Sequence, residues 1–140
     1  RMSDLQAPSD QDLENELNVM PLLAQYFGCE VEKTDDQFAT YDFKLIQDGI
    51  HWGWVEYRRR RFASNKYKTT ILSAHKFDEK NKLETYFCVE WDDVIAIKLL
   101  GMSWKRKAVP FRRGANHRPG DKTEPVVHIS TPSLTPLRYK

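Results

Sequence analysis

The sequence predicts an α/β domain in which a central mixed, mainly antiparallel sheet is flanked by helices. Two observations support this class: an amphipathic helical pattern near the N-terminus, and strand-like segments that follow it. A chain of 140 residues that is 40% hydrophobic can bury one core but not two. We therefore expect a flexible segment over 1–8, a single domain over 9–130 with a basic loop over 102–122, and an irregular tail over 131–140.

The first expected element is a helix over Asp10–Phe27. Ser9 and Asp12 resemble a capping box at its start, and apolar residues then recur at helical spacing. Gly28 suits the position just past its C-terminus. Pro21 lies inside the pattern, so we expect the helix to be kinked there or split in two.

The remaining elements follow from alternation and turn residues. A short edge strand is expected at Glu30–Thr34, and two longer strands at Phe38–Ile46 and Ile50–Phe62. A polar loop and a second helix should come next. The later ranges are loop 63–68, helix Thr69–Glu84, and strands Phe87–Trp91, Val94–Leu99 and Pro125–Ile129.

The loop between the two longer strands decides which side chains share a face. A three-residue loop over 47–49, with Gly49 in the left-handed conformation, would set Asp42 opposite Trp54. Asp42 and Glu56 would then form a diagonal pair on one face, roughly 7–8 Å apart at the backbone. A two-residue Asp48-Gly49 turn would instead put the two acids on opposite faces.

Charge is unevenly distributed along the chain. Residues 1–42 hold ten acidic residues against Arg1 and Lys33, a net charge of −8. Since the whole chain carries +2, the remainder carries +10. This division suggests a half that binds a polyanion beside an acidic cluster.

A pair of carboxylates on one hairpin suits phosphodiester hydrolysis. That reaction needs a cation to offset charge on the phosphate and to deliver hydroxide at neutral pH. Hard cations such as Mg²⁺ take oxygen ligands and keep several waters, so one or two carboxylates suffice. Asp42 and Glu56 supply such a pair. Arg58, two residues after Glu56, could orient the attacking water and stabilise developing charge.

The order of these elements resembles the PD-(D/E)XK nuclease superfamily. The resemblance rests on YDF at 41–43, the turn ending at Gly49, VEYR at 55–58, and LSAHK at 72–76 within the expected second helix. EPVVHI at 124–129 resembles a late strand of small phage-type members. The resemblance implies a restriction-endonuclease-like core and a deoxyribonuclease that uses Mg²⁺ or Mn²⁺ to hydrolyse DNA.

The resemblance also implies roles for particular residues. Asp42 and Glu56 would be metal ligands, and a glutamate on the first helix would complete the site. Glu16 is the first choice because it shares a helical face with apolar residues, and Glu14 is the alternative.

Arg58 stands where the family pattern has lysine. Arginine stays charged and holds its donors in a rigid plane, whereas the pKa of lysine can be tuned. If water activation needs lysine, Lys76 or Lys68 could supply it.

Basic residues beyond this motif are candidates for DNA contact. Rings interleaved with them, at Trp104 and Phe111, could stack on exposed bases. A solvated strand edge and a disordered loop are the alternative interpretations. Trp52 and Trp54 are expected on the face of Glu56, either roofing the site or packing in the core. The expected DNA contacts are Arg59, Arg60, Arg61, Lys66, Lys68, Lys105, Arg106, Lys107, Arg112 and Arg113.

The expected partner is DNA rather than a membrane, and a homodimer stays open. Without a secretory leader, and with Cys29 and Cys88 far apart, we expect a location in the cytoplasm of a bacterium or phage-infected host. Two other functions stay open. One is a non-catalytic DNA-binding module that has lost turnover through Arg58, and the other is a domain that binds an acidic partner protein.

Overall fold

The computed structural model describes residues 10–34, 41–74, 82–111 and 124–140. These residues form one α-helix, α1 (Asp10–Phe27), two short 3₁₀ helices and two sheets. The larger sheet has six strands in the order β1-β2-β3-β5-β6-β9, and the smaller has the order β4-β8-β7. The strands are β1 (Glu30–Lys33), β2 (Phe43–Gln47), β3 (Ile50–Arg59), β4 (Thr69–Ser73), β5 (Glu84–Glu90), β6 (Val94–Leu99), β7 (Val109–Phe111), β8 (Glu124–Ser130) and β9 (Thr135–Tyr139).

The larger sheet is mixed and mainly antiparallel. β3 and β5 pair in parallel, and the other neighbouring strands pair antiparallel. The predicted fold class is therefore confirmed: this is a small α/β fold compatible with a restriction-endonuclease-like core. Among the described residues the sheet is covered by one α-helix rather than several.

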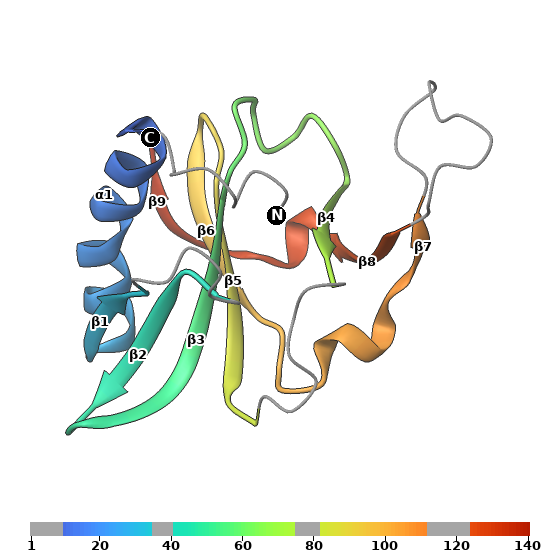
Figure 1. Cartoon of the computed structure of the whole chain (residues 1–140). Helices are drawn as coiled ribbons and strands as arrows, with labels where there is room; N and C mark the ends of the chain where they lie inside the picture. The colour runs from blue at the N-terminus through green and yellow to red at the C-terminus, as the bar shows by residue number, and fades with distance from the viewer. Residues whose placement is uncertain (1–9, 35–40, 75–81, 112–123) are drawn as a thin grey trace.

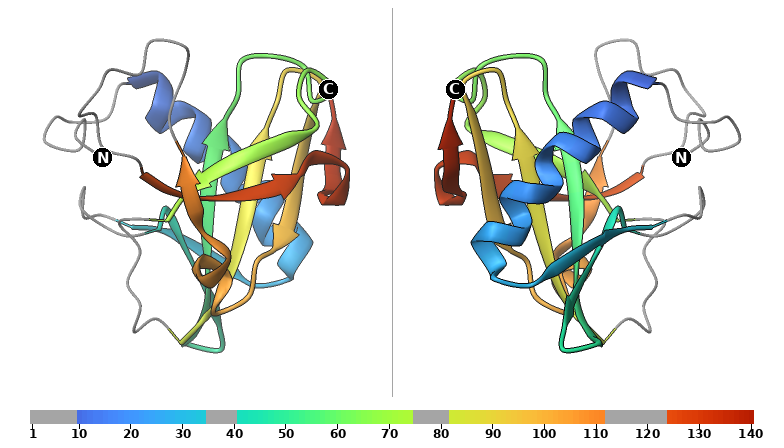
Figure 2. Two further views of the ribbon diagram at one scale, coloured as in Figure 1. Left: turned by 90° about the vertical axis from the view of Figure 1, so that its right-hand side faces the viewer. Right: turned by 90° about the vertical axis from the view of Figure 1, so that its left-hand side faces the viewer.

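The two faces of the larger sheet carry different layers (Figure 1). α1 packs on one face, where Val19 and Leu23 join Phe43, Leu45 and Val55 in one apolar cluster. The smaller sheet crosses the other face, as the side views in Figure 2 show. A second cluster fills that side and includes Leu72, Phe87, Val89, Trp104 and Val127. Each cluster buries apolar side chains from both of its layers, which is the main force holding the layers together.

α1 has the bounds that the sequence predicts, and it continues through Pro21 as a single element. The predicted split at Pro21, which is exposed, is therefore absent. The short edge strand, the hairpin strands and the later strands are also found, with ends that differ by a few residues where they are described; positions 38–40 of the predicted strand Phe38–Ile46 lie outside the described residues. No helix among the described residues is long and apolar enough to cross a membrane. Cys29 and Cys88 are both free thiols.

The predicted second helix, Thr69–Glu84, is wrong at both ends of its range, and residues 75–81 within it lie outside the described residues. Thr69–Ser73 forms β4, and Glu84 begins β5. β4 pairs with β8, more than fifty residues further along the chain. Three of its five residues are Thr or Ile, whose branching at Cβ favours a strand over a helix.

The C-terminal residues and the basic loop are also more regular than predicted. Thr135–Tyr139 is the edge strand β9, so the irregular tail is a wrong prediction. Pro136 is accommodated because an edge strand does not need every N–H for pairing. Within the expected loop 102–122, Trp104–Lys107 forms the 3₁₀ helix η2 and Val109–Phe111 forms β7. The second 3₁₀ helix, η3, spans Thr131–Ser133.

Candidate metal and nucleic-acid site

The hairpin between β2 and β3 turns on two residues, not three. Gln47 pairs with Ile50, and Asp48 and Gly49 both have positive φ, at 52° and 77°. Positive φ at both central residues is the type I′ geometry that Asp-Gly favours. The predicted three-residue loop is therefore wrong, and this turn alone would put Asp42 and Glu56 on opposite faces.

A β-bulge in β3 reverses that effect. Ile46 pairs with His51 but Leu45 pairs with Gly53, so Trp52 is an extra residue on β3. One extra residue inverts the alternation of every side chain beyond it. The register then runs through Phe43 opposite Val55, and its continuation sets Asp42 opposite Glu56 rather than in the predicted diagonal position.

The bulge also separates two tryptophans that were expected on one face. Trp52 packs against α1, with its ring centroid 5.7 Å from that of Phe27. Trp54 faces the other way and stacks on Tyr41 at 5.3 Å, in the cluster beneath the smaller sheet. Both rings pack in the core, which was one of the two predicted roles.

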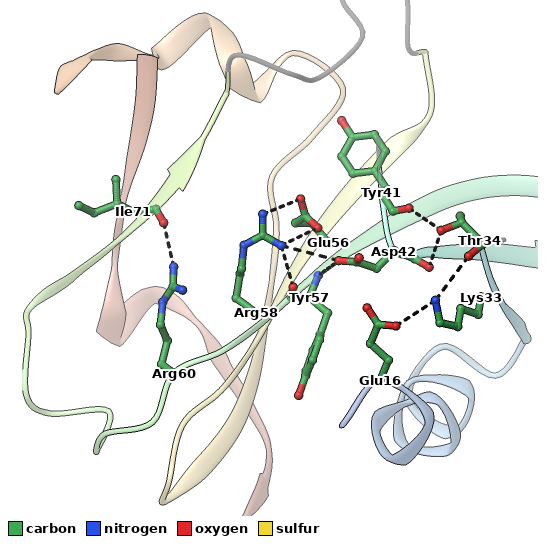
Figure 3. A network of polar contacts seen from close by, with 10 residues as sticks. All are labelled: Glu16, Lys33, Thr34, Tyr41, Asp42, Glu56, Tyr57, Arg58, Arg60 and Ile71. Carbon is green, nitrogen blue, oxygen red and sulfur yellow. Dashed lines mark hydrogen bonds and ion pairs between the residues drawn. The ribbon is translucent and has the colours of Figure 1, made fainter. Parts of the chain in front are cut away.

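Asp42 lies just before β2 and is held by the backbone of β3. Its Oδ2 accepts a hydrogen bond of 2.9 Å from the Tyr57 N–H (Figure 3). Its carbonyl oxygen accepts bonds from the Thr34 N–H and hydroxyl, at 3.0 and 3.1 Å. The aspartate is thus fixed on both its main chain and its side chain, with 12% of the side chain exposed.

Glu56 is buried and is paired with Arg58. Its two carboxylate oxygens accept from Arg58 Nη1 and Nη2 at 3.0 and 3.3 Å. Arg58 Nη1 also lies 3.9 Å from Asp42 Oδ2, so the two carboxylates converge on one guanidinium. Figure 3 shows both acids directed at Arg58. Since Glu56 is only 3% exposed, this cation offsets the cost of burying its charge.

The donor chemistry of this pair fits a hard divalent cation. Both acids supply carboxylate oxygens, and both already direct oxygens at a single cationic centre. Within the described ranges, no three His, Cys, Asp or Glu side chains group closely enough to hold a metal. Asp42 and Glu56 could therefore hold such an ion, with water completing its coordination shell, provided that the Arg58 guanidinium moves away from the two carboxylates.

Glu16, the predicted third acid, forms an ion pair with Lys33. Its carboxylate contacts Lys33 Nζ at 3.0 Å, linking α1 to the edge strand β1. Lys33 also donates to the Thr34 carbonyl at 3.5 Å, and so borders Asp42 through Thr34 (Figure 3). Lys33 is not among the site residues predicted from the sequence. Lys33 pairs with Phe43 in the β1–β2 ladder, and Phe43 is the residue after Asp42. This strand pairing is the signal that places Lys33 near the site. Glu14, the alternative helix glutamate, is exposed.

The predicted basic residues divide into two groups. Arg59 binds Asp92 at 2.8 Å and the Glu90 carbonyl at 3.1 Å, and Arg60 donates to the Ile71 carbonyl at 3.3 Å. These two arginines link strands within the protein. The other described ones form an exposed basic group: Arg61, Lys66, Lys68, Arg106 and Lys107, with Lys105 partly buried beside them. Lys76, Arg112 and Arg113 lie outside the described residues.

Trp104 does not serve as an exposed stacking ring. It is 4% exposed, lies in the core cluster and donates from Nε1 to the Tyr41 hydroxyl at 3.4 Å. The side chain of Phe111 lies outside the described residues. The predicted stacking role is therefore wrong for Trp104, which is a core residue.

Comparison with known proteins gives one finding. The model of the family described as "Phage putative PDDEXK endonuclease" matches residues 6–137. No curated protein and no solved structure matches the chain.

Proposed function

This chain belongs to the phage PD-(D/E)XK endonuclease family, and from that premise we propose that it is a DNA endonuclease that depends on a divalent metal. Asp42 and Glu56 would hold Mg²⁺ or Mn²⁺. The observation that carries this proposal is the convergence of both carboxylates on one cationic nitrogen, at 3.9 and 3.0 Å.

Two features support the assignment of the carboxylates. Burial of Glu56 and the Tyr57 N–H bond to Asp42 keep both acids in place before any ligand arrives. A bound metal would offset charge on the scissile phosphate and supply hydroxide at neutral pH. The protein's own contribution is to hold the two carboxylates side by side on one face of the sheet, where the scissile phosphate would bind.

Arg58 would act as a fixed positive charge and not as a base. Its guanidinium does not lose a proton in proteins, so it cannot accept one from water. Released from Glu56, its planar donors could bind a phosphate oxygen in a bidentate manner. We assign it the role of stabilising charge on the phosphate, while a lysine would be needed if a tunable cation takes part.

The exposed basic group defined above would hold the DNA backbone. Arg61, Lys66 and Lys68 follow β3 directly, while Arg106 and Lys107 lie on η2. Contacts of this kind neutralise phosphates and release counterions, so binding should weaken steeply as salt rises.

Arg58 also favours a second candidate function. The guanidinium of Arg58 binds both oxygens of Glu56 and supplies the positive charge that a metal ion would otherwise provide. A chain that kept this pair permanently would bind DNA through its basic surface without cutting it. The two functions differ in one property, which is turnover in the presence of a divalent metal.

Cleavage of supercoiled plasmid tests the choice. The wild-type protein should nick plasmid in Mg²⁺ or Mn²⁺ and not in EDTA, and Glu56→Ala should abolish nicking. Asp42→Asn is the sharper variant, because an amide oxygen can still accept from the Tyr57 N–H while the negative charge is gone. Glu30→Ala, at an exposed position on β1, is the matched control and should cut normally.

The opposite results separate the candidates. If the wild-type protein binds plasmid but fails to cut it whichever divalent metal is supplied, the non-catalytic function is correct. If cutting survives in both Asp42→Asn and Glu56→Ala, the assigned metal site is wrong.

A further inference from the structure

A pocket of about 470 Å³ opens at the end of the larger sheet, away from the carboxylates. Its floor is apolar and includes Trp91, Val94 and Leu134. Tyr67 and Tyr139 stand at its walls, and they are 56% and 74% exposed. Large exposed rings around a pocket of this size are typical of a binding site for a small planar group.

Three segments distant in sequence build this pocket. They are the loop between β3 and β4, the turn between β5 and β6, and the η3–β9 segment, which gather at one end of the sheet (Figure 2). Ser64 donates from N–H and hydroxyl to Asp93, at 2.7 Å each. The Thr131 hydroxyl donates to the Tyr67 carbonyl at 3.1 Å, and the Lys140 N–H donates to the Asp93 carbonyl at 2.9 Å. These bonds fix the walls independently of any ligand.

The charge around the pocket suits an anionic ligand. Lys68 and Asn65 both line it, and its described lining includes no acidic residue. The ammonium of Lys66 lies 5.6 Å from the Tyr67 ring centroid. Three acids lie near the pocket, and each carboxylate already has a partner: Asp93 accepts from Ser64, Asp92 pairs with Arg59 at 2.8 Å, and Glu90 pairs with Lys140 at 2.5 Å.

The pocket and the carboxylates lie on one face of the sheet. Trp91, Val94 and Leu134 belong to the apolar cluster against which Trp54 packs, and Glu56 is two residues from Trp54 on the same strand.

The Arg60 N–H bonds to the Glu90 carbonyl, so the end of β3 lies level with the pocket's edge. Four residues of strand separate Glu56 from that edge, roughly 13 Å. A DNA strand covers this length in about four nucleotides.

We propose that this pocket binds one unpaired nucleobase of the DNA strand, with its sugar and phosphate directed at Lys68. The rings of Tyr67 and Tyr139 would contact the faces of the base, and Asn65 offers both a donor and an acceptor to its polar edge. A base inside a duplex cannot present its face to these rings. The inference rests on DNA as the substrate in the proposed function, and it specifies DNA with at least one unpaired nucleotide.

Binding of metal-free protein to labelled oligonucleotides tests the proposal, since no cleavage interferes in EDTA. Fluorescence anisotropy should give tighter binding to a single strand than to the same strand with abasic residues. Tyr67→Ala and Tyr139→Ala should each weaken binding to the intact strand by about 5-fold to 100-fold, because stacking on the bound base is lost. Neither variant should change binding to the abasic strand.

Two further variants separate the pocket from the fold. Tyr67→Phe keeps the ring and should bind as the wild type does. Tyr26→Ala removes another exposed tyrosine, 49% exposed on α1 at the opposite face, and should leave binding unchanged. Equal binding of intact and abasic strands by the wild type, or unchanged binding in both alanine variants, would overturn the proposal. If these binding results are obtained and Glu56→Ala still abolishes plasmid nicking, the endonuclease function is supported and only the base pocket is ruled out.

Discussion

The guanidinium of Arg58 donates to both carboxylate oxygens of Glu56, at 3.0 and 3.3 Å. Both side chains are largely buried, with 18% of Arg58 and 4% of Glu56 exposed. Removing one member of a buried ion pair leaves the other charge without compensation, which costs about 3–5 kcal/mol. Since the same nitrogen faces Asp42, a metal ion and Arg58 should compete for one place.

Replacing Arg58 with alanine should therefore destabilise the protein and make it depend on metal. In EDTA, we expect the free energy of unfolding in Arg58→Ala to fall by about 3–5 kcal/mol, measured by urea denaturation. Mn²⁺ should restore more stability to the variant than it adds to the wild type, because binding to the folded state alone stabilises it. Arg61→Ala, at an exposed position, is the control and should change little. An equal response to Mn²⁺ in Arg58→Ala and the wild type would contradict competition.

Replacing Arg58 with lysine should preserve or raise the rate of DNA cleavage. Lysine keeps the positive charge but lacks the planar pair of donors that arginine places on both oxygens of Glu56. We expect single-turnover cleavage in Mg²⁺ to be at least as fast in Arg58→Lys as in the wild type. A large loss of rate with unchanged DNA affinity would show that the planar guanidinium itself is required.

The bulge in β3 should be sensitive to a single added methyl group. A Cβ at Gly53 would lie 3.1 Å from Leu45 Cδ1 and 3.3 Å from the Glu84 carbonyl oxygen. Leu45 is fully buried and Glu84 pairs with Gly53 in the parallel ladder, so neither can move freely. Gly53→Ala should lower the free energy of unfolding by about 1–3 kcal/mol in urea denaturation. Asp48→Asn is the control in the hairpin turn, and it should change the free energy of unfolding little because Asn also suits positive φ. An effect of Gly53→Ala as small as that of the control would argue against close packing around Gly53.

Glu90 should contribute to stability only above acidic pH. Burial raises its pKa, but hydrogen bonds from Lys140 and Tyr57 and nearby positive charges together lower it below the ordinary value of 4.5. A lowered pKa in the folded state stabilises the protein above the unfolded value, and this stabilisation is lost as pH falls through the folded value. Urea denaturation between pH 3 and pH 6, roughly, should therefore show a flatter decline in Glu90→Gln than in the wild type. The same slope in both proteins would contradict this, and Glu30→Gln, exposed on β1, should follow the wild type.

Local patterns predicted the helix and most strands because those elements depend on nearby residues. The apolar period over Asp10–Phe27 and the alternation after Ile50 each report a buried face directly. β4 was missed because its pairing with β8 involves residues far away in sequence. β9 was missed because its proline is tolerable only at a sheet edge, which a local pattern cannot identify.

The candidate acids were chosen from sequence, but by a route that was partly wrong. The expected three-residue loop and the actual two-residue turn differ by one residue, which alone would invert the face of Glu56. The extra residue Trp52 supplies the missing shift. Nothing in a strand pattern marks such a bulge except Gly53, since glycine in a strand interior often accompanies one. The pairing of Glu16 with Lys33 depends on how α1 sits against β1, which spacing along the chain does not determine.

The most direct test of the metal site is anomalous diffraction from crystals of the wild-type protein soaked in Mn²⁺. We expect one anomalous peak between the carboxylates of Asp42 and Glu56, with Mn–O distances near 2.2 Å, roughly the range of hard divalent cations. The Arg58 guanidinium should have moved away from Glu56. Arg58 still bound to both oxygens of Glu56, with no anomalous peak at this pair in Mn²⁺-saturated crystals, would contradict it.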